Sequence, residues 1–353
     1  MEKQANGGAT AVNDDLVLVG SRTTKERNAR GEGLTLWDAS KPEWQLLDTL
    51  PMTNPSWITA GAGSTYYVLH GDGAEVSTVE ISAERKILRR QTIDCLGLNP
   101  VHAAVKDDSR LIIANYATGT VAAFNIDSAG NLQSNGNVIN LGNLYAKQFV
   151  DEESRDSHPH QILILPERNG ILVPDKGLDA LFVIDIADGG LHAVDIIRTA
   201  PGSGPRHAAI SPNRSDSLYV VGELNSTLMH FLIGPNCTLD FQSSYSTLPR
   251  EHTGDDSSAA GIVVDDTRVF VSNRGHDSIA VFDLDMGGTP VKCSIAEAGG
   301  AFPRFITLRS DALVIAHENG DTIAKATLDT VSGLPSPQVI ARTGSPVCVQ
   351  TVG

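Results

Sequence analysis

The sequence predicts an all-β fold, a seven-bladed β-propeller whose ring is closed by the C-terminal strand joining the N-terminal blade. Three observations predict it: a hairpin pattern that recurs along the chain, seven corner segments, and a last corner that only one strand follows. Repeats of this size in an all-β chain are typical of propeller blades, which have four strands each.

The hairpins are the first observation. Each is a run of β-branched and aromatic residues, a turn rich in Gly, Asn or Asp, and a second such run. The copies are Leu111–Ile126, Ile171–Ile186, Leu218–Ile233, Val269–Leu284 and Leu313–Leu328, with Tyr67–Ile81 as a weaker member. No segment holds a 3.6-residue apolar period over three turns, which excludes helical repeats.

A small-residue or Pro-containing corner precedes each hairpin. The corners begin at Pro55, Pro100, Pro159, Pro205, Ala259, Pro303 and Pro346, at separations of 45, 59, 46, 54, 44 and 43 residues. The long separation before Pro159 predicts an insertion at about 137–157, read as a solvated loop or as a lid over the channel mouth. The whole chain, 1–353, is expected to form one domain.

The two ends of the chain are expected to share a blade. After Pro346 only the strand Val347–Thr351 remains, whereas the N-terminal part starts in mid-blade with Leu16–Gly20 and Gly33–Trp37. If the last strand completes the first blade, the sheet edges that an open ring would expose disappear.

Composition and charge exclude several classes of function. The net charge of −15 argues against nucleic acid as a partner, because phosphate contacts need clustered Lys and Arg. No run of about 20 apolar residues predicts a membrane span. The start Met1-Glu2-Lys3-Gln4 lacks the apolar core of a signal peptide, so the chain as given reads as cytoplasmic. Secretion with prior removal of a signal peptide stays open, because there are three N-x-S/T sequons.

The four cysteines show no C-x-x-C spacing, which argues against a zinc site and leaves buried thiols or one disulfide open. The pair His158-x-His160 lacks an identifiable acidic third ligand, so no metal and no cofactor is expected.

Polar and titratable residues accumulate at equivalent repeat positions. Because the inner strands of a propeller line its channel, residues at the corners and at the strand ends should converge around one mouth. The candidates for substrate binding are His102, His158, Gln161, His207, Lys176, Asn273, Arg304 and His317. The site that they predict suits a small anionic molecule, since a few local arginines outweigh the negative charge of the chain in a cleft.

Four segments carry a family resemblance that covers nearly the whole chain. They are His158–Gln161, Gly204–His207, Gly222–Asn225 and Ser272–Ile279. These segments resemble the motifs of the seven-bladed propeller lactonases, which include propeller-type 6-phosphogluconolactonases and fungal 3-carboxy-cis,cis-muconate lactonizing enzymes. The resemblance implies a metal-independent enzyme with His160, Arg206, Glu223 and Arg274 as the catalytic set.

Three positions depart from the pattern of that family. Gly261 stands where relatives usually have Glu, Phe305 stands where His is common, and the run from His317 to Gly320 replaces an Asn-Gln type. All three are expected near the mouth, so the substrate need not be that of either named enzyme.

The chemistry expected of the set is ring opening or ring closure on a lactone. Arg206 and Arg274 would clamp the anion, and His160 and Glu223 would act as an acid–base pair. Two alternatives stay open. One is a natural-product cyclase that uses the same channel, marked by an apolar pocket. The other is a non-catalytic propeller that binds protein, marked by an exposed apolar rim patch. The sequence leaves the oligomeric state undecided.

Overall fold

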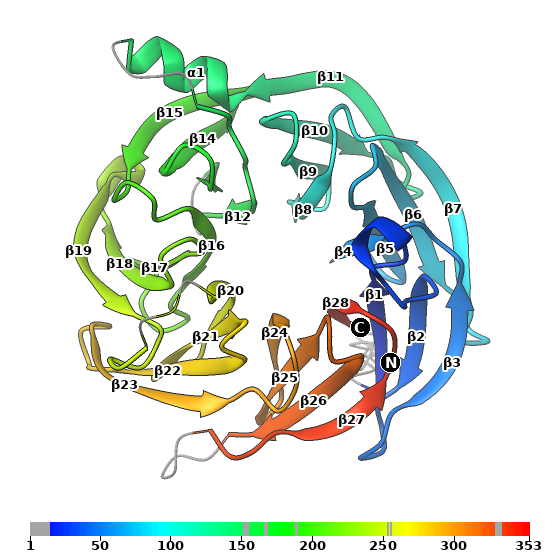
Figure 1. The fold of residues 1–353 in the computed structure, drawn as a ribbon. Coiled ribbons are helices and arrows are strands. Elements are labelled where there is room, and N and C mark those ends of the chain that lie inside the picture. The colour runs from blue at the N-terminus through cyan, green and yellow to red at the C-terminus, as the bar shows by residue number, and fades with distance from the viewer. Residues whose placement is uncertain are drawn as a thin grey trace, which may run out of the picture.

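A computed structural model describes residues 15–150, 155–165, 169–187, 190–252, 254, 256–328 and 334–353. Within these residues the chain forms seven four-stranded antiparallel sheets around a central axis (Figure 1). The seven-bladed propeller predicted from the repeat is therefore confirmed.

We number the blades in ring order, and each is given from its innermost to its outermost strand. Blade 1 holds β28 (Pro346–Val352), β1 (Leu16–Ser21), β2 (Leu34–Asp38) and β3 (Gln45–Leu50). Blade 2 holds β4 (Pro55–Ala60), β5 (Thr65–His70), β6 (Glu75–Ile81) and β7 (Ile87–Asp94). Blade 3 holds β8 (Pro100–Lys106), β9 (Arg110–Asn115), β10 (Thr120–Ile126) and β11 (Leu132–Asn140).

The other four blades follow the same order. Blade 4 holds β12 (Leu163–Ile164), β13 (Gly170–Asp175), β14 (Ala180–Ala187) and β15 (Gly190–Arg198). Blade 5 holds β16 (Pro205–Ile210), β17 (Ser217–Gly222), β18 (Thr227–Ile233) and β19 (Leu239–Ser246). Blade 6 holds β20 (Ser258–Val264), β21 (Arg268–Arg274), β22 (Ser278–Leu284) and β23 (Pro290–Glu297), and blade 7 holds β24 (Pro303–Arg309), β25 (Ala312–His317), β26 (Thr322–Thr327) and β27 (Gln338–Arg342).

The ring closes inside blade 1. The inner strand β28 pairs with β1 in an antiparallel register that sets Val349 opposite Val19 and Val352 opposite Leu16. The C-terminal strand thus covers the edge of β1, as the unpaired last corner predicted.

The hydrophobic core is divided into seven clusters, one between each pair of neighbouring blades. Between blades 1 and 2, for example, Leu18 and Leu36 pack with Ile58 and Val68, and all four are buried. Burying each such side chain stabilises the fold by about 1.5–3 kcal/mol. Because the packing runs between blades, it holds the inner strands, and the side chains at their ends, at fixed places around the axis.

The segment expected as a loop insertion at 137–157 is partly regular. Residues 137–140 belong to the outer strand β11, and the helix α1 (Leu141–Gln148) follows it. The Asn140 side chain caps this helix by accepting from the Asn143 N–H, and Leu141 and Tyr145, one turn apart, are its buried residues. A two-turn helix with one apolar pair is too short to show a period in the sequence.

The helix α1 lies at the outer rim of the ring and not over the channel mouth (Figure 1). Of the charged run 151–156, residues 151–154 lie outside the described residues, while Arg155 pairs with Asp179 at 2.7 Å. The two further helical turns are short 3₁₀ segments, η1 (Lys25–Arg27) and η2 (Pro235–Cys237). Across the described ranges, none of the helices is long and apolar enough to cross a membrane.

Candidate functional site

The inner strands are irregular at their first residues, and this places side chains in the channel. The register between inner and second strand shifts just after Pro55, Pro100, Pro205, Ala259 and Pro303. Such bulges bend a strand and redirect a side chain, and they are frequent beside active sites. In blade 5 the shifted residues are Arg206 and His207, and in blade 7 the shifted residue is Arg304.

A second ring of side chains comes from the ends of the second strands. The residues paired with the seven corners are Ser21, His70, Asn115, Asp175, Gly222, Asn273 and His317. The next residues in the seven blades are Arg22, Gly71, Tyr116, Lys176, Glu223, Arg274 and Glu318. Five of them, Arg22, Tyr116, Lys176, Glu223 and Arg274, line a cavity at the mouth. Glu223 is thus the equivalent of Lys176 and Arg274. Gly222, the residue before it, is the equivalent of Asp175 and Asn273.

Three cations converge on Glu223. Lys176 Nζ lies 2.6 Å from Glu223 Oε1, and Arg274 Nη2 lies 3.2 Å from the same oxygen. Arg206 Nε lies 2.9 Å from Oε2. The three cations come from blades 4, 5 and 6, so the carboxylate ties together the ends of three blades.

The charge state of Glu223 follows from these neighbours. Burial alone would raise the pKa of this carboxyl, but the charges of Arg274, Arg206 and Lys176 lower it to about 2. Glu223 is therefore a carboxylate at neutral pH and a very weak base. This conflicts with the proton-transfer role that the sequence suggested for it, and it favours a role in holding the cations in place.

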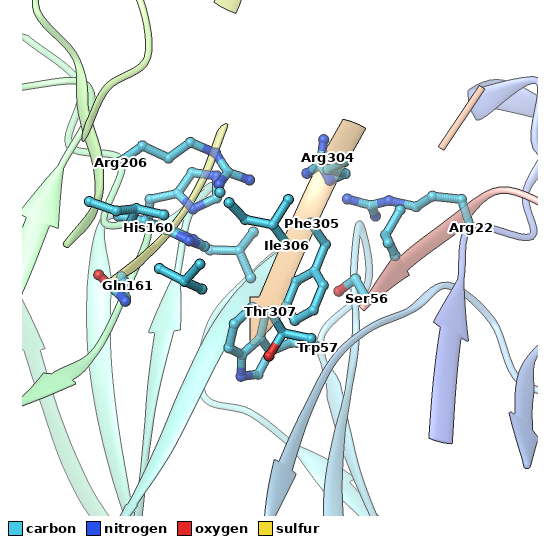
Figure 2. Close-up of a pocket in the computed structure, with 16 residues that line it drawn as sticks. Arg22, Ser56, Trp57, His160, Gln161, Arg206, Arg304, Phe305, Ile306 and Thr307 are labelled. Carbon is cyan, nitrogen blue, oxygen red and sulfur yellow. The ribbon is translucent and has the colours of Figure 1, made fainter. Parts of the chain in front are cut away.

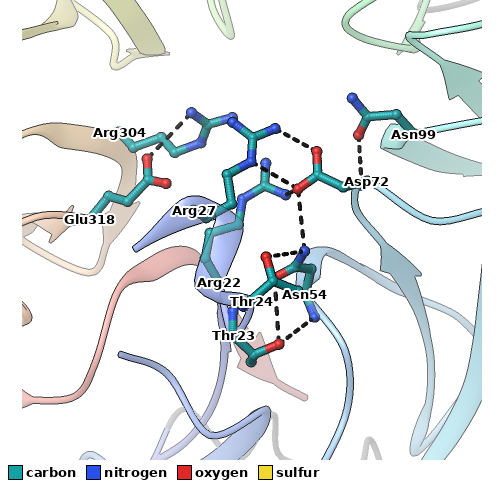
Figure 3. A network of polar contacts seen from close by, with 9 residues as sticks. All are labelled: Arg22, Thr23, Thr24, Arg27, Asn54, Asp72, Asn99, Arg304 and Glu318. Atoms are coloured by element: carbon teal, nitrogen blue, oxygen red, sulfur yellow. Dashed lines mark hydrogen bonds and ion pairs between the residues drawn. The ribbon is translucent and has the colours of Figure 1, made fainter. Parts of the chain in front are cut away.

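A second group of cations lies on blades 1 and 7. Arg22 Nη1 is 3.1 Å from Asp72 Oδ2, and Arg27 pairs with Asp72 through two of its nitrogens (Figure 3). Arg304 Nη1 lies 3.3 Å from Glu318 Oε2. Neither Arg22 nor Arg27 is among the residues predicted from the sequence. Arg22 follows the second strand of blade 1, so comparing that position with the same position in the other blades would have pointed to it.

Two cavities occupy this end of the channel. The outer one, of about 230 Å³, is lined by Arg27, Asn99, Tyr116, Lys176, Glu223 and Arg274 among others. The deeper one, of about 210 Å³, is lined by Trp57, His207, Arg206, Phe305, Ile306 and Val347 among others. The two share Arg22, Val101, His160 and Arg304. Figure 2 shows Arg206 and His160 on one side of the deeper cavity, Arg22 on the other and Arg304 between them.

Charge is unevenly distributed at this mouth. The two cavities and their ion pairs bring together six cationic side chains, Arg22, Arg27, Lys176, Arg206, Arg274 and Arg304. They face three carboxylates, Glu223, Asp72 and Glu318. The site is therefore positive on a chain whose net charge is −15, and it favours an anionic ligand.

The imidazoles at the junction of the cavities are neutral. Burial, with the nearby charges of Arg206 and Arg304, holds the pKa of His160 well below its usual range. Burial and the Arg206 charge likewise lower the pKa of His207. A neutral imidazole has a free lone pair and can accept a proton from water.

Several buried polar atoms around the cavities have no hydrogen-bond partner among the described residues. They are Arg22 Nε, Ser56 Oγ, His160 Nδ1, His207 Nε2 and Arg274 Nε. Buried polar groups are nearly always paired in native proteins, so unpaired ones at one place are where water or a ligand can bind.

Three predicted residues lie near the cavities but are engaged with protein groups. His102 Nδ1 accepts from the Ile162 N–H at 3.2 Å, and the ring packs against Trp57 in a tilted arrangement at a centroid distance of 3.9 Å. The Gln161 side chain lines the deeper cavity and bonds both the N–H and the C=O of Ala208, which joins blades 4 and 5. His158 stacks on Tyr116 outside the two cavities.

Asn273 and His317 tie the ends of their strands to the connection from the preceding blade. Asn273 donates to the Thr247 carbonyl at 2.7 Å and accepts from the Thr247 hydroxyl at 2.7 Å. His317 Nε2 lies 2.8 Å from the Ala298 carbonyl and Nδ1 lies 3.1 Å from Thr322 Oγ1. Both side chains are fully buried and neither lines the two cavities, so the structure does not bring them to the mouth.

The described residues bear on the metal site, the disulfide and the protein-binding rim that were considered from the sequence. Among these residues, no group of three His, Cys, Asp or Glu side chains could hold a metal ion, and no disulfide joins any two of the four cysteines. Large exposed apolar side chains on the described outer strands are spread one per blade and form no rim patch. They are Leu46, Leu88, Val138, Val194, Phe241, Val291 and Val339. Outside the strands, Leu98 and Leu224 are exposed beside the mouth residues Asn99 and Glu223, and they belong to different blades.

Comparison with known proteins gives one consistent result. The family model described as "Lactonase, 7-bladed beta-propeller" matches residues 16–351. A Bacillus subtilis (strain 168) protein named 6-phosphogluconolactonase is 31% identical over 242 residues, which are 66% of this chain and 67% of that protein. Among solved structures, the Pseudomonas aeruginosa periplasmic gluconolactonase PpgL superposes with a TM-score of 0.83 at 22% identity, over 96% of this chain and 99% of that one. A protein from Lactobacillus plantarum gives 0.82 at 22% identity, over 95% and 98%.

Proposed function

Because this chain belongs to the family of seven-bladed β-propeller lactonases, we propose that it hydrolyses the ring of a small anionic lactone at the mouth of its channel. The name of the Bacillus subtilis relative suggests an acidic sugar lactone, such as a phosphorylated gluconolactone, as the substrate. The observation that carries the proposal is the excess of cations around the two cavities of a strongly acidic chain.

Arg274 is the donor that we assign to the developing negative charge. Addition of water to the lactone carbonyl places a negative charge on its oxygen, and donors fixed in advance in a partly dry site stabilise that charge strongly. Arg274 Nε is buried and has no partner among the described residues, while Nη2 is held by Glu223. The guanidinium is thus fixed in position and retains a free donor. Arg206 is held by the same carboxylate, and its positive charge also stabilises the negative charge on the carbonyl oxygen.

His160 is the base that we assign to the attacking water. Its Nδ1 is buried without a partner, and the residue lines both cavities. His160 takes a proton from water as the oxygen adds to the carbonyl carbon. It returns this proton to the ring oxygen when the C–O bond breaks, which leaves a hydroxy acid. Burial, the larger cause of the lowered pKa of His160, persists when a substrate binds, but an anionic substrate offsets the charges of Arg206 and Arg304 and so raises this pKa.

Glu223 positions the cations in this scheme and transfers no proton. The carboxylate stays ionised at any working pH, because its pKa is about 2. Its three ion pairs hold Lys176, Arg206 and Arg274 close together. Without the carboxylate, the repulsion between these three positive charges would push the side chains apart.

The test is acid release at constant pH from 6-phosphogluconolactone and glucono-δ-lactone, with the spontaneous rate subtracted. His160→Gln should lower kcat about 10²- to 10⁴-fold. Arg274→Met should lower it about 10²- to 10³-fold. The matched control is Arg90→Met, which removes an exposed arginine that pairs with Glu80 far from the mouth. Incubation with the open hydroxy acid tests ring closure, which is the reverse reaction.

Wild-type-like turnover in both folded variants would refute the assigned roles. Absence of any turnover of lactones by the wild-type chain would refute the proposed activity itself.

A further inference from the structure

We propose that Arg22, together with Arg304 and Arg27, forms a second anion site that binds a phosphate or carboxylate group carried by the substrate away from its lactone ring. The proposal rests on the proposed function for the reaction at the ring, but the anion site can be tested without any turnover. The substrate class that it implies is a lactone with a further oxyanion, so that one molecule bridges the two cation clusters of the mouth.

Arg22 is held inside the channel wall. Its side chain is 3% exposed and lines both cavities. It follows β1 at the ring position that Gly71 holds in blade 2, and a Cβ at Gly71 would come within 2.5 Å of Arg22 Nη1. The guanidinium therefore occupies space that is open because blade 2 has a glycine there.

The network around Asp72 fixes this guanidinium (Figure 3). Asp72 Oδ2 accepts from Arg22 at 3.1 Å, from Arg27 at 2.9 Å and from Asn54 at 3.2 Å. The Asp72 N–H in turn donates to Asn99 Oδ1 at 2.9 Å. One carboxylate thus holds two arginines, which leaves a positive charge uncompensated on this side.

Arg22 retains donors for a ligand. Only one of its guanidinium nitrogens bonds Asp72, and Nε is buried with no partner among the described residues. A buried, preorganised guanidinium is well suited to the oxygens of phosphate or carboxylate, because its donors form a planar fork.

Arg304 completes the site from blade 7. It lines the same two cavities, and its pair with Glu318 is longer, at 3.3 Å. Burial, followed by the charge of Arg304, lowers the pKa of Arg22 to about 10, so the two guanidinium groups repel each other. An oxyanion that contacts both would remove this repulsion.

The two cation clusters lie on different sides of one cavity. Figure 2 shows Arg206 and His160 opposite Arg22, with Arg304 between them. Held at its oxyanion by Arg22 and Arg304, a short lactone would present its carbonyl to His160 and Arg274. The cluster of Arg22, Arg27 and Arg304 then decides which lactones bind, and the cluster around Glu223, with His160, acts on the ring.

The first experiment uses inorganic phosphate alone and measures the rise in melting temperature of the full chain with phosphate concentration. Arg22→Met should weaken the apparent affinity about 10- to 100-fold, the usual effect of removing a charged hydrogen-bond partner. Arg90→Met, which removes an exposed arginine, serves as the control and should match the wild type. A folded Arg22→Met variant with wild-type affinity for phosphate would overturn the proposal, even if the anion bound beside Glu223 instead.

A second variant changes affinity in the opposite direction. Glu318→Gln removes the carboxylate that pairs with Arg304 but keeps the shape of the side chain. The added net charge should tighten phosphate binding roughly 3- to 10-fold. Unchanged or weaker binding in this variant would count against the site, and it would do so even if Arg22→Met failed to fold.

Enzyme kinetics then show whether the site binds a phosphate or a carboxylate group of the substrate. We compare kcat/KM for a phosphorylated sugar lactone, a lactone with a second carboxylate and a neutral sugar lactone. The preference of the wild type for one charged lactone over the neutral one should fall about 10- to 100-fold in Arg22→Met, through KM more than kcat. An equal loss on charged and neutral lactones would refute the anion site. If the wild type opens no lactone, the proposed function fails, but the phosphate measurements still decide on the site.

Discussion

Replacing Glu223 with Gln tests whether one carboxylate holds the mouth together. The carboxylate is buried and shared by Lys176, Arg206 and Arg274. A group whose pKa falls from 4.5 to about 2 on folding contributes about 3 kcal/mol of stability at neutral pH. We therefore expect Glu223→Gln to lower the free energy of unfolding by about 3 kcal/mol at pH 7, in the range found when a buried ion pair loses one partner.

The stabilisation by Glu223 should decrease as the pH falls. Because the folded pKa is depressed, the stabilisation by Glu223 is complete above about pH 4.5 and is lost as pH falls towards 2. The difference in free energy of unfolding between variant and wild type should narrow from about 3 kcal/mol at pH 7 to less than half of that at pH 3. Urea unfolding followed by tryptophan fluorescence at the two pH values measures both differences.

The matched control is Glu80→Gln, which removes the carboxylate of an exposed pair with Arg90. Exposed ion pairs contribute less than about 1 kcal/mol. A Glu223→Gln variant within about 0.5 kcal/mol of the wild type at pH 7, or a gap that does not narrow at pH 3, would refute this account of the cluster.

Three further predictions concern the fold. Deleting residues 346–353 removes β28 and uncovers the edge of β1, so the chain should melt at a lower temperature and self-associate; a monodisperse product with the wild-type melting temperature would contradict this. Gly275→Ala should destabilise the chain by about 1–3 kcal/mol in urea unfolding, because the residue has φ +90° and a Cβ would clash with the Asp256 carbonyl; an unchanged midpoint would count against it. Reducing agent should leave the melting temperature unchanged, because no disulfide joins any two of the four cysteines; a fall would indicate a disulfide.

The fold could be predicted from the sequence because the corners are local signals. A proline or small residue begins six of the seven inner strands, and Pro159 forms a bridge just before the seventh. The hairpins that follow carry the alternation and turn residues that strands require. The closed ring was also predictable, because one strand had no partner elsewhere in its own repeat.

The site was predictable only in part, because equivalence between blades depends on register. Arg206 and Arg304 follow their corners directly and were found. Arg22 was not found, because it lies in the blade that the two ends of the chain build together, where no corner precedes it. The equivalence of Glu223 and Lys176 was also hidden, because it depends on which residue of the second strand lies opposite the corner, and the sequence does not show this register. The roles of Asn273 and His317 at the connections between blades depend on partners 19 to 26 residues away, which no local pattern specifies.

The pairing of β28 with β1 has a consequence for how the protein matures during synthesis. Arg22 leaves the ribosome early and Arg304 late, yet the proposed anion site needs both. Blades 2 to 6 can fold one after another as they emerge, whereas blade 1 waits for a strand more than 300 residues downstream. A nascent chain would therefore form most of the ring before the anion site of Arg22 and Arg304 is complete. Ligand binding would become possible only in the step that closes the circle.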